Sequence, residues 1–206
     1  MEQQSPEWFA ARLGRATASR IADIMAKTKT GPSASRANYM AELIAERLTG
    51  TPAERFQNAA MQWGTDNEDA ARQQYSFQTE LEVDTCGFVG HPSIEMAGAS
   101  PDGLISEDGL VEIKCPNTAT HIDTLLSGKV PDKYVIQMLW QMACTGRKWC
   151  DFVSFDPRLP SDMRIFIRRV HFDAERVAEM EREVIAFLSE VETKITELQA
   201  VVARAA

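Results

Sequence analysis

Three charged residues in the middle of the chain, Asp102, Glu112 and Lys114, are of the types that assist phosphodiester hydrolysis. Glu112 and Lys114 are two residues apart in a short run rich in apolar residues, and Asp102 precedes a similar run. Because side chains two residues apart on a strand share one face, Glu112 and Lys114 are expected side by side. The pattern therefore predicts a carboxylate and an ammonium on one face, next to a second carboxylate.

Such a face suits hydrolysis assisted by a metal ion. Mg²⁺ prefers oxygen ligands and keeps several waters, so Asp102, Glu112 and the Ile113 backbone carbonyl would be sufficient to hold it. Lys114 would orient the attacking water, accept its proton if its pKa were lowered, or stabilise charge on the phosphate oxygens. The alternative is a surface hairpin whose Glu112 and Lys114 are an ordinary pair on its solvated side.

The stretch from Gly98 to Pro116 has the pattern of a β-hairpin. Two apolar segments flank a polar turn, in which Asp108 and Gly109 are expected to supply the positive φ angles of a tight connection. Alternation along the second segment places three apolar side chains on the face opposite Glu112, namely Val111, Ile113 and Cys115. The hairpin thus separates a chemical face from a packing face.

Glu68 is a further candidate, carried by a helix expected over residues 57–77 with a break at Gly64. Thr65 and Glu68 match a capping box, in which each side chain bonds the backbone N–H of the other residue. That local pattern alone explains Glu68. The functional alternative places its carboxylate over the metal site.

Arg12 and Ser19 lie near the ends of two short helices expected close to the N-terminus. Ser5 begins the first helix as its N-cap and Gly14 ends it, which leaves Arg12 in the last turn, where the dipole favours a cation. Thr17 or Ser19 would cap the second helix, which ends at Met25. Hydroxyl groups and N–H groups at such a terminus also bind anions, so Arg12 with Ser19 is a candidate grip for a terminal phosphate.

Gln137 lies on a helix expected over residues 132–143, on the same face as Tyr134, with Gln141 one turn further on. Buried amide groups need hydrogen-bond partners. One interpretation is a bond within the core. The other is that Gln137 orients a carboxylate, the lysine or a phosphate.

The other elements follow from periodicity and turn residues. Helices are expected over 36–48 and 122–126, and from Asp173 onward, where a broad apolar stripe is expected to cover the sheet. Strands are expected over 81–88, 95–99, 150–155 and 163–172. Residues 27–35 contain Gly and Pro but no large apolar side chain, which predicts a mobile loop.

Composition indicates a soluble globular protein. The chain has 206 residues, of which 44% are hydrophobic and 25% charged, enough for one domain with a substantial core. No run is apolar enough to span a bilayer and no secretory signal is recognisable, so we expect a cytoplasmic protein without membrane partners. Four cysteines lack Cys-x-x-Cys spacing, which predicts reduced, mostly buried thiols and disfavours a zinc site or disulfide framework.

The net charge of -8 is unfavourable for a protein that binds a polyanion. The charge is unevenly distributed, however. Residues 8–41 contain six cations and one anion, whereas residues 173–206 contain eight anions and four cations. We therefore expect a basic end that faces DNA and an acidic end remote from it.

Five blocks in order resemble the phage lambda exonuclease family of viral recombination nucleases (YqaJ type), within the PD-(D/E)xK superfamily. They are Trp-x3-Arg-Leu-Gly-x2-Thr-Ala-Ser (8–19), Trp-Gly-x3-Glu (63–68), Ser-Pro-Asp-Gly (100–103), Glu-Ile-Lys-Cys-Pro (112–116) and Tyr-x2-Gln (134–137). The resemblance continues to residues 156–158. It implies an α/β (α+β) nuclease fold in which helices flank a central mixed β-sheet. Residues 1–206 would form a single nuclease domain, with 173–206 as an acidic C-terminal helix packed on the core.

The resemblance also implies an activity: processive 5′-to-3′ digestion of linear double-stranded DNA, leaving 3′ overhangs for recombination by single-strand annealing. The expected cofactor is two Mg²⁺ ions, with Mn²⁺ able to replace them, and the expected assembly is a homotrimeric ring that also binds a single-strand annealing protein. Because such a ring is retained on DNA by topology, the net charge does not exclude the activity.

Site roles follow from the same resemblance. Asp102 and Glu112 would be metal ligands together with the Ile113 carbonyl, and Lys114 would act on the nucleophilic water. Two further residues would support this site, Glu68 and Gln137, and three would hold the 5′-phosphate, Arg12, Ser19 and Ser100.

Two other functions remain open at this point. One is a different nuclease with the same chemistry, such as a sequence-specific endonuclease or a Cas4-like nuclease, although the cysteines do not suit an iron–sulfur cluster. The other is a non-catalytic DNA-binding scaffold, which the intact acidic and lysine positions disfavour.

Overall fold

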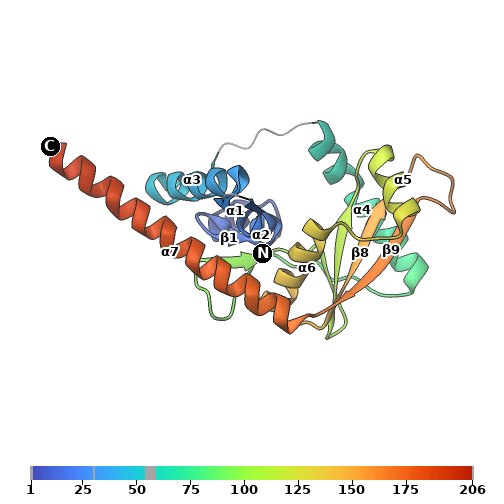
Figure 1. The fold of residues 1–206 in the computed structure, drawn as a ribbon. Helices are drawn as coiled ribbons and strands as arrows, with labels where there is room; N and C mark the ends of the chain where they lie inside the picture. The colour runs from blue at the N-terminus through green and yellow to red at the C-terminus, as the bar shows by residue number, and fades with distance from the viewer. Residues whose placement is uncertain (1, 30, 54–58, 206) are drawn as a thin grey trace.

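A four-stranded mixed sheet carries the predicted hairpin and lies at the centre of one half of the molecule (Figure 1). The computed structural model describes residues 2–29, 31–53 and 59–205. The strands are β6 (Gly103–Ile105), β7 (Gly109–Lys114), β8 (Trp149–Phe155) and β9 (Ile165–His171), in that order. Only β7 and β8 pair in parallel; the other neighbours are antiparallel. The predicted hairpin and the two later strands are confirmed.

Helices cover both faces of this sheet because both faces are apolar. One face, with Val111 and Ile113, packs on α4 (Ala59–Thr79). The other, with Leu110 and Phe152, packs on α6 (Asp132–Thr145). Glu112 belongs to the α6 face and is fully buried, so the interpretation of a solvated surface hairpin is wrong.

The hairpin turn departs from the expected geometry. Ser106 has the positive φ angle, 47°, whereas Gly109 does not. Gly109 is needed for a different reason: a Cβ there would lie 2.1 Å from the Trp149 ring on the neighbouring strand. Arg147 completes the turn by donating to the carbonyl oxygens of Ile105, Ser106 and Gly109.

A smaller sheet joins the N-terminal part of the chain to this core. It consists of β1 (Ala16–Thr17), β5 (Ala97–Ala99) and β4 (Val89–Gly90). The strand expected over 81–88 is wrong, because that segment forms only an isolated bridge between Asp84 and Leu104. Leu104 belongs to β6, which has only three residues, so residues 81–88 have no longer strand there with which to pair.

The N-terminal helices follow the sequence only in part. Ser5 caps α1 (Pro6–Arg12) by accepting from the N–H of Trp8, as predicted. The second helix is instead a 3-10 turn, η1 (Ala18–Arg20), followed by α2 (Ile21–Met25), and neither begins with a side-chain cap. The predicted capping by Thr17 or Ser19 is therefore wrong.

The predicted loop at 27–35 is also wrong for its described residues. β2 (Lys27–Thr28) and β3 (Gly31–Pro32) pair in antiparallel fashion, and Ser33 then caps α3 (Ala34–Thr49). Gly50 ends α3 in the left-handed conformation, as expected.

Helix α4 shows no break at Gly64, so this prediction is wrong; residues 57–58 lie outside the described part. Thr65 lies inside the helix, where its Oγ1 donates to the Met61 carbonyl at 3.3 Å. The predicted capping box is consequently absent. The Glu68 carboxylate is available for other partners, because its helix needs no cap at this point.

Two further helices complete the fold. α5 (Thr118–Ser127) is longer than expected, and α7 (Ala174–Ala205) begins directly after Asp173, which accepts from the Arg176 N–H. The apolar stripe of α7 packs mainly on α2, α3 and α6 rather than on the sheet. Figure 1 shows the C-terminal end of α7 extending past all other elements.

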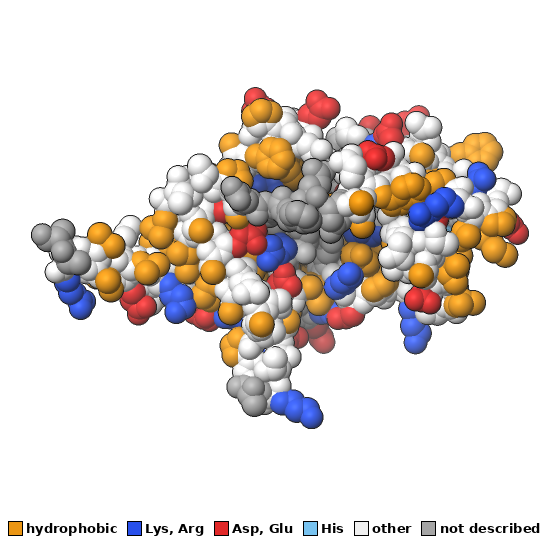
Figure 2. All heavy atoms as spheres, turned by 90° about the horizontal axis from the view of Figure 1, so that it is seen from above, with side chains coloured by type: hydrophobic (Ala, Val, Ile, Leu, Met, Phe, Trp, Pro, Cys, Tyr) orange, Lys and Arg blue, Asp and Glu red, His pale blue; other side chains and the backbone are white. Residues whose placement is uncertain are grey.

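The two charged ends of the chain are joined in the structure. Cations of the N-terminal part pair with acids of α7: Lys27 with Glu183, Arg36 with Glu190 and Arg47 with Glu192. Figure 2 shows acidic and basic side chains interspersed over the visible face. The expected separation into a basic DNA-facing end and an acidic remote end is thus wrong, because α7 folds back on the basic segment.

Two further features concern the cysteines and the length and polarity of the helices. All four cysteines are free thiols, and three are buried. Within the described ranges, every helix is too short or too polar to cross a bilayer.

Candidate active site

The hairpin register brings the two predicted carboxylates together. Gly103 pairs with Val111, so Asp102 lies just outside the ladder, opposite Glu112. Asp102 Oδ2 accepts a hydrogen bond from the Ile113 N–H at 2.7 Å, which fixes its carboxylate against β7. The two acids therefore lie on neighbouring strand ends, as their spacing predicted.

Glu112 is held by three donors in the interior. Gln137 Nε2 donates to Oε1 at 2.6 Å, and Gln141 Nε2 donates to Oε2 at 2.6 Å. Lys114 Nζ forms an ion pair with Oε1. Because a buried carboxylate is costly unless its oxygens are satisfied, these contacts stabilise the charge and fix its position. Both interpretations of Gln137 hold: it makes a core hydrogen bond that orients a carboxylate.

Gln141 was not among the predicted site residues, although it supplies the second donor. The signal was present, since Gln137 and Gln141 are one helical turn apart. What the sequence did not give was the register between α6 and β7.

The Lys114 ammonium is stabilised in this arrangement. Burial disfavours its charge, but the adjacent Glu112 and Asp102 outweigh burial and raise the Lys114 pKa. The expectation that Lys114 accepts a proton through a lowered pKa finds no support. A cationic role, in orienting water or stabilising negative oxygens, is the one that fits.

The acids at this site repel one another. Burial, together with the charge of Glu112, raises the pKa of Asp102 well above its ordinary value. Burial also raises the pKa of Glu68, an effect that Arg72 and Lys114 oppose and Glu112 reinforces. A bound cation would relieve both effects, because it favours the ionised carboxylates.

The donor set fits a hard cation that keeps several waters. Asp102, Glu112 and the Ile113 carbonyl are all oxygen donors. In the parts of the chain that the structure describes, no three His, Cys, Asp or Glu side chains are grouped closely enough to hold a metal by themselves. The fit to a hard cation therefore rests on the oxygen donors of Asp102, Glu112 and Ile113, with waters completing the coordination.

Glu68 reaches the same cleft from α4. Its Oε1 accepts from Arg72 at 2.8 Å. The cleft has a volume of about 670 Å³ and contains Glu68, Ile113, Lys114 and Gln137. Three elements thus bring predicted groups to this cleft, namely α4, β7 and α6, whereas Asp102 and the buried Glu112 lie behind Lys114 and Gln137 and are not among the lining residues.

Two of the three predicted phosphate-binding residues, Arg12 and Ser19, line different but adjoining clefts. Ser19 lines the cleft of Glu68 and Lys114, whereas Arg12 lines a second cleft of about 460 Å³. Arg12 contacts Ser100, whose Oγ accepts from the Arg12 guanidinium at 3.1 Å and from Trp8 Nε1 at 2.9 Å. Arg12 and Ser100 are therefore brought together, but Ser19 is separate from them.

Comparison with known proteins places these features in context. A model of the YqaJ-like viral recombinase domain matches residues 7–148. The chain is 54% identical to an alkaline exonuclease (LHK-Exo) from Laribacter hongkongensis, covering 98% of this chain and 100% of that one with a TM-score of 0.91. The complex of LHK-Exo with dAMP matches at the same identity and coverage with a TM-score of 0.92. A phage-related exonuclease from Haemophilus somnus 129PT shares the fold alone, at 17% identity, 89% and 96% coverage and a TM-score of 0.71. No curated protein matches the chain.

These matches confirm the predicted fold class, a mixed sheet flanked by helices in a lambda-exonuclease-like nuclease structure.

Proposed function

Since the chain belongs to the family of YqaJ-like viral recombinase domains, as its motif order predicted, we propose that it is a metal-dependent exonuclease that acts on double-stranded DNA. The observation that carries this proposal is the buried Glu112, fixed by two amides beside Asp102 and Lys114. The 54% identity to an alkaline exonuclease supports the same conclusion.

The proposed cofactor is two Mg²⁺ ions, which Mn²⁺ is able to replace. The groups that would hold them are Asp102, Glu112 and the Ile113 carbonyl. When bound, the metal supplies an activated water and neutralises charge on the phosphate. The protein's own contribution is positional. Gln137 and Gln141 keep Glu112 in one orientation, and the Lys114 ammonium is placed to orient water or to stabilise phosphate oxygens.

The finer proposal concerns polarity and products. The enzyme digests the 5′-ended strand of linear duplexes processively and leaves 3′ overhangs for single-strand annealing. Arg12 and Ser100 bind the terminal 5′-phosphate, and Ser19 contacts the strand in the neighbouring cleft. The support is their geometry: Met61 and Thr65 of α4 line both clefts, so the clefts adjoin.

Assembly and partners belong to the same proposal. A homotrimeric ring would keep the enzyme on its substrate without the many phosphate contacts that an acidic protein lacks. A single-strand annealing protein would receive the overhang.

The Arg12→Ala variant is expected to lose its preference for phosphorylated ends, because a charge-assisted contact to a terminal phosphate is removed. The measurement compares initial rates on duplexes with 5′-phosphate and 5′-hydroxyl ends. Arg182→Ala, on α7, is the matched control and should keep the wild-type preference. An unchanged preference in Arg12→Ala would place the phosphate pocket elsewhere.

Polarity is tested with linear duplexes labelled at one end. We expect the 5′ label to be released first, as mononucleotide, while the 3′ label stays on long strands. Early release of the 3′ label would refute the proposed polarity.

A further inference from the structure

Two lysines line the cleft that contains Glu68, Lys114 and Gln137. Lys114 is paired with Glu112. Lys133 is exposed, and no carboxylate among the described residues forms an ion pair with it. The preceding acid, Asp132, is itself paired with Arg176. Among the described residues, Lys133 is therefore a cation lining this cleft that forms no ion pair.

Its position follows from the helix that carries it. Lys133, Gln137 and Gln141 recur at intervals of four residues along α6, so they form one row on its surface. Gln141 and Gln137 bond the buried Glu112, and Lys133 is one turn, about 6 Å, further toward the N-terminal end. The row thus runs from the buried carboxylate to the exposed start of α6.

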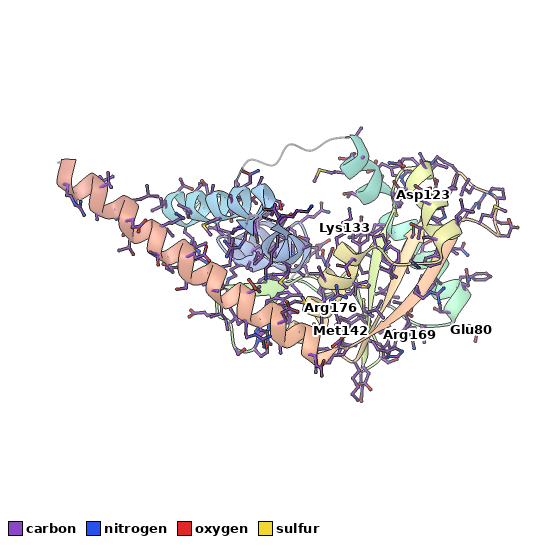
Figure 3. All side chains as sticks on the ribbon, viewed as in Figure 1. Glu80, Asp123, Lys133, Met142, Arg169 and Arg176 are labelled. Carbon is purple, nitrogen blue, oxygen red and sulfur yellow. The ribbon has the colours of Figure 1, made fainter. Side chains whose placement is uncertain are left out.

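An aromatic ring links the two lysines. The ring centroid of Tyr134 lies 4.7 Å from Lys133 Nζ and 5.4 Å from Lys114 Nζ. The ring is itself stacked on Phe152 of β8, with centroids 5.5 Å apart. Figure 3 shows Lys133 between the N-terminal helices and the sheet, while Arg169 and Glu80 lie lower in the view.

From this placement we infer that Lys133 binds a backbone phosphate of the DNA strand that enters the cleft, next to the one that is cleaved. A lysine acts as a point charge for phosphate, and the N-terminal end of α6 adds partial positive charge at the same place. This inference rests on the proposed function. It assigns Lys133 to substrate positioning, without contact to the reacting atoms.

The test compares Lys133→Gln with Lys133→Arg and with Lys148→Gln. Lys148 is a matched control because it pairs with Asp108 at the opposite end of the sheet, about 20 Å along the strands from Lys114. Loss of such an exposed pair has little effect on stability. Thermal unfolding of each variant checks that the fold is retained.

Equilibrium binding of a fluorescent linear duplex, measured with Ca²⁺ at several salt concentrations, gives the first readout. The logarithm of the association constant falls linearly with the logarithm of the salt concentration, and loss of one phosphate contact should make this negative slope shallower by about 0.9. Between about 50 and about 200 mM salt, the affinity advantage of wild type over Lys133→Gln should shrink about 3.5-fold. Lys133→Arg and Lys148→Gln should match wild type.

Steady-state kinetics with Mg²⁺ give the second readout. We expect Lys133→Gln to raise KM and leave kcat within about twofold, since uniform binding is lost. An unchanged salt slope and KM would overturn the inference while the nuclease proposal stands. Wild-type protein that binds DNA but cuts nothing would overturn the nuclease proposal, and the binding slopes would still decide the role of Lys133.

Discussion

Lys114→Met is expected to lower the rate of DNA hydrolysis by about 10³-fold, the range lost with a positioned proton-transfer or charge-stabilising group. Methionine keeps the apolar stem but removes the ammonium that lies beside Glu112 and the Tyr134 ring. DNA affinity should change little, because the lost group acts on water and on the reacting phosphate. The measurement pairs single-turnover cleavage with equilibrium binding of the same duplex.

Stability must be followed in the same variant. Glu112 is fully buried, and without Lys114 the amides of Gln137 and Gln141 remain as its partners among the described residues. Removal of one member of a buried ion pair typically costs about 3–5 kcal/mol. A lower melting temperature is thus expected, and rates must be measured well below it. Wild-type turnover in Lys114→Met would refute the site assignment.

Asp102→Asn is expected to reduce cleavage by about 100-fold or more. The amide oxygen can still accept from the Ile113 N–H, so the local backbone should persist while one negative charge is lost. If that charge contributes about 3 kcal/mol through the metal, the rate falls by about two orders of magnitude. Calorimetric titration of Mg²⁺ supplies a second readout and should show weaker binding.

The control for this variant is Asp108→Asn, in the turn of the same hairpin. Its carboxylate is half exposed and paired with Lys148, at the end of β7 remote from Lys114. It should cleave DNA and bind Mg²⁺ as wild type does. Equal metal affinity in Asp102→Asn and wild type would remove Asp102 from the proposed ligand set.

The hairpin was predictable because its signals are local. Alternation along β7 correctly separated Glu112 and Lys114 from the apolar face of Val111 and Ile113. The conformation of the turn was not predictable in the same way. Ser106 has the positive φ angle, and position 109 needs a glycine because a Cβ there would clash with the Trp149 ring. That requirement comes from a strand forty residues away along the chain, which turn rules do not include.

At Glu68, packing of the helix on the sheet prevails over a local sequence pattern. Thr65 and Glu68 match a capping box, yet α4 continues through them because Ala71 and Tyr75 hold it on the sheet. Once Thr65 bonds the Met61 carbonyl within the helix, the Glu68 side chain no longer serves as a cap. A strong short-range pattern therefore favoured the wrong role for the residue.

The predicted separation of a basic end from an acidic end is also wrong, because it depends on contacts between segments far apart in the sequence. The sequence separates basic residues 8–41 from acidic residues 173–206, but α7 folds back on the basic segment and pairs with its Lys27 and Arg36. These cations are consequently committed to holding the fold. Positive charge for the substrate has to come from other cations, such as Arg12 beside Ser100 and Lys133 at the start of α6.

The central claim is that this chain cuts DNA from an end by metal-dependent hydrolysis. The most direct test incubates the purified protein with a closed circular duplex and with the same circle cut once, with Mg²⁺ or with a chelator. We predict that the linear form is degraded only with Mg²⁺ and that the closed circle stays intact. Cleavage of the closed circle at defined sites would indicate an endonuclease, and two intact substrates would indicate a non-catalytic DNA-binding protein; either result would contradict the claim.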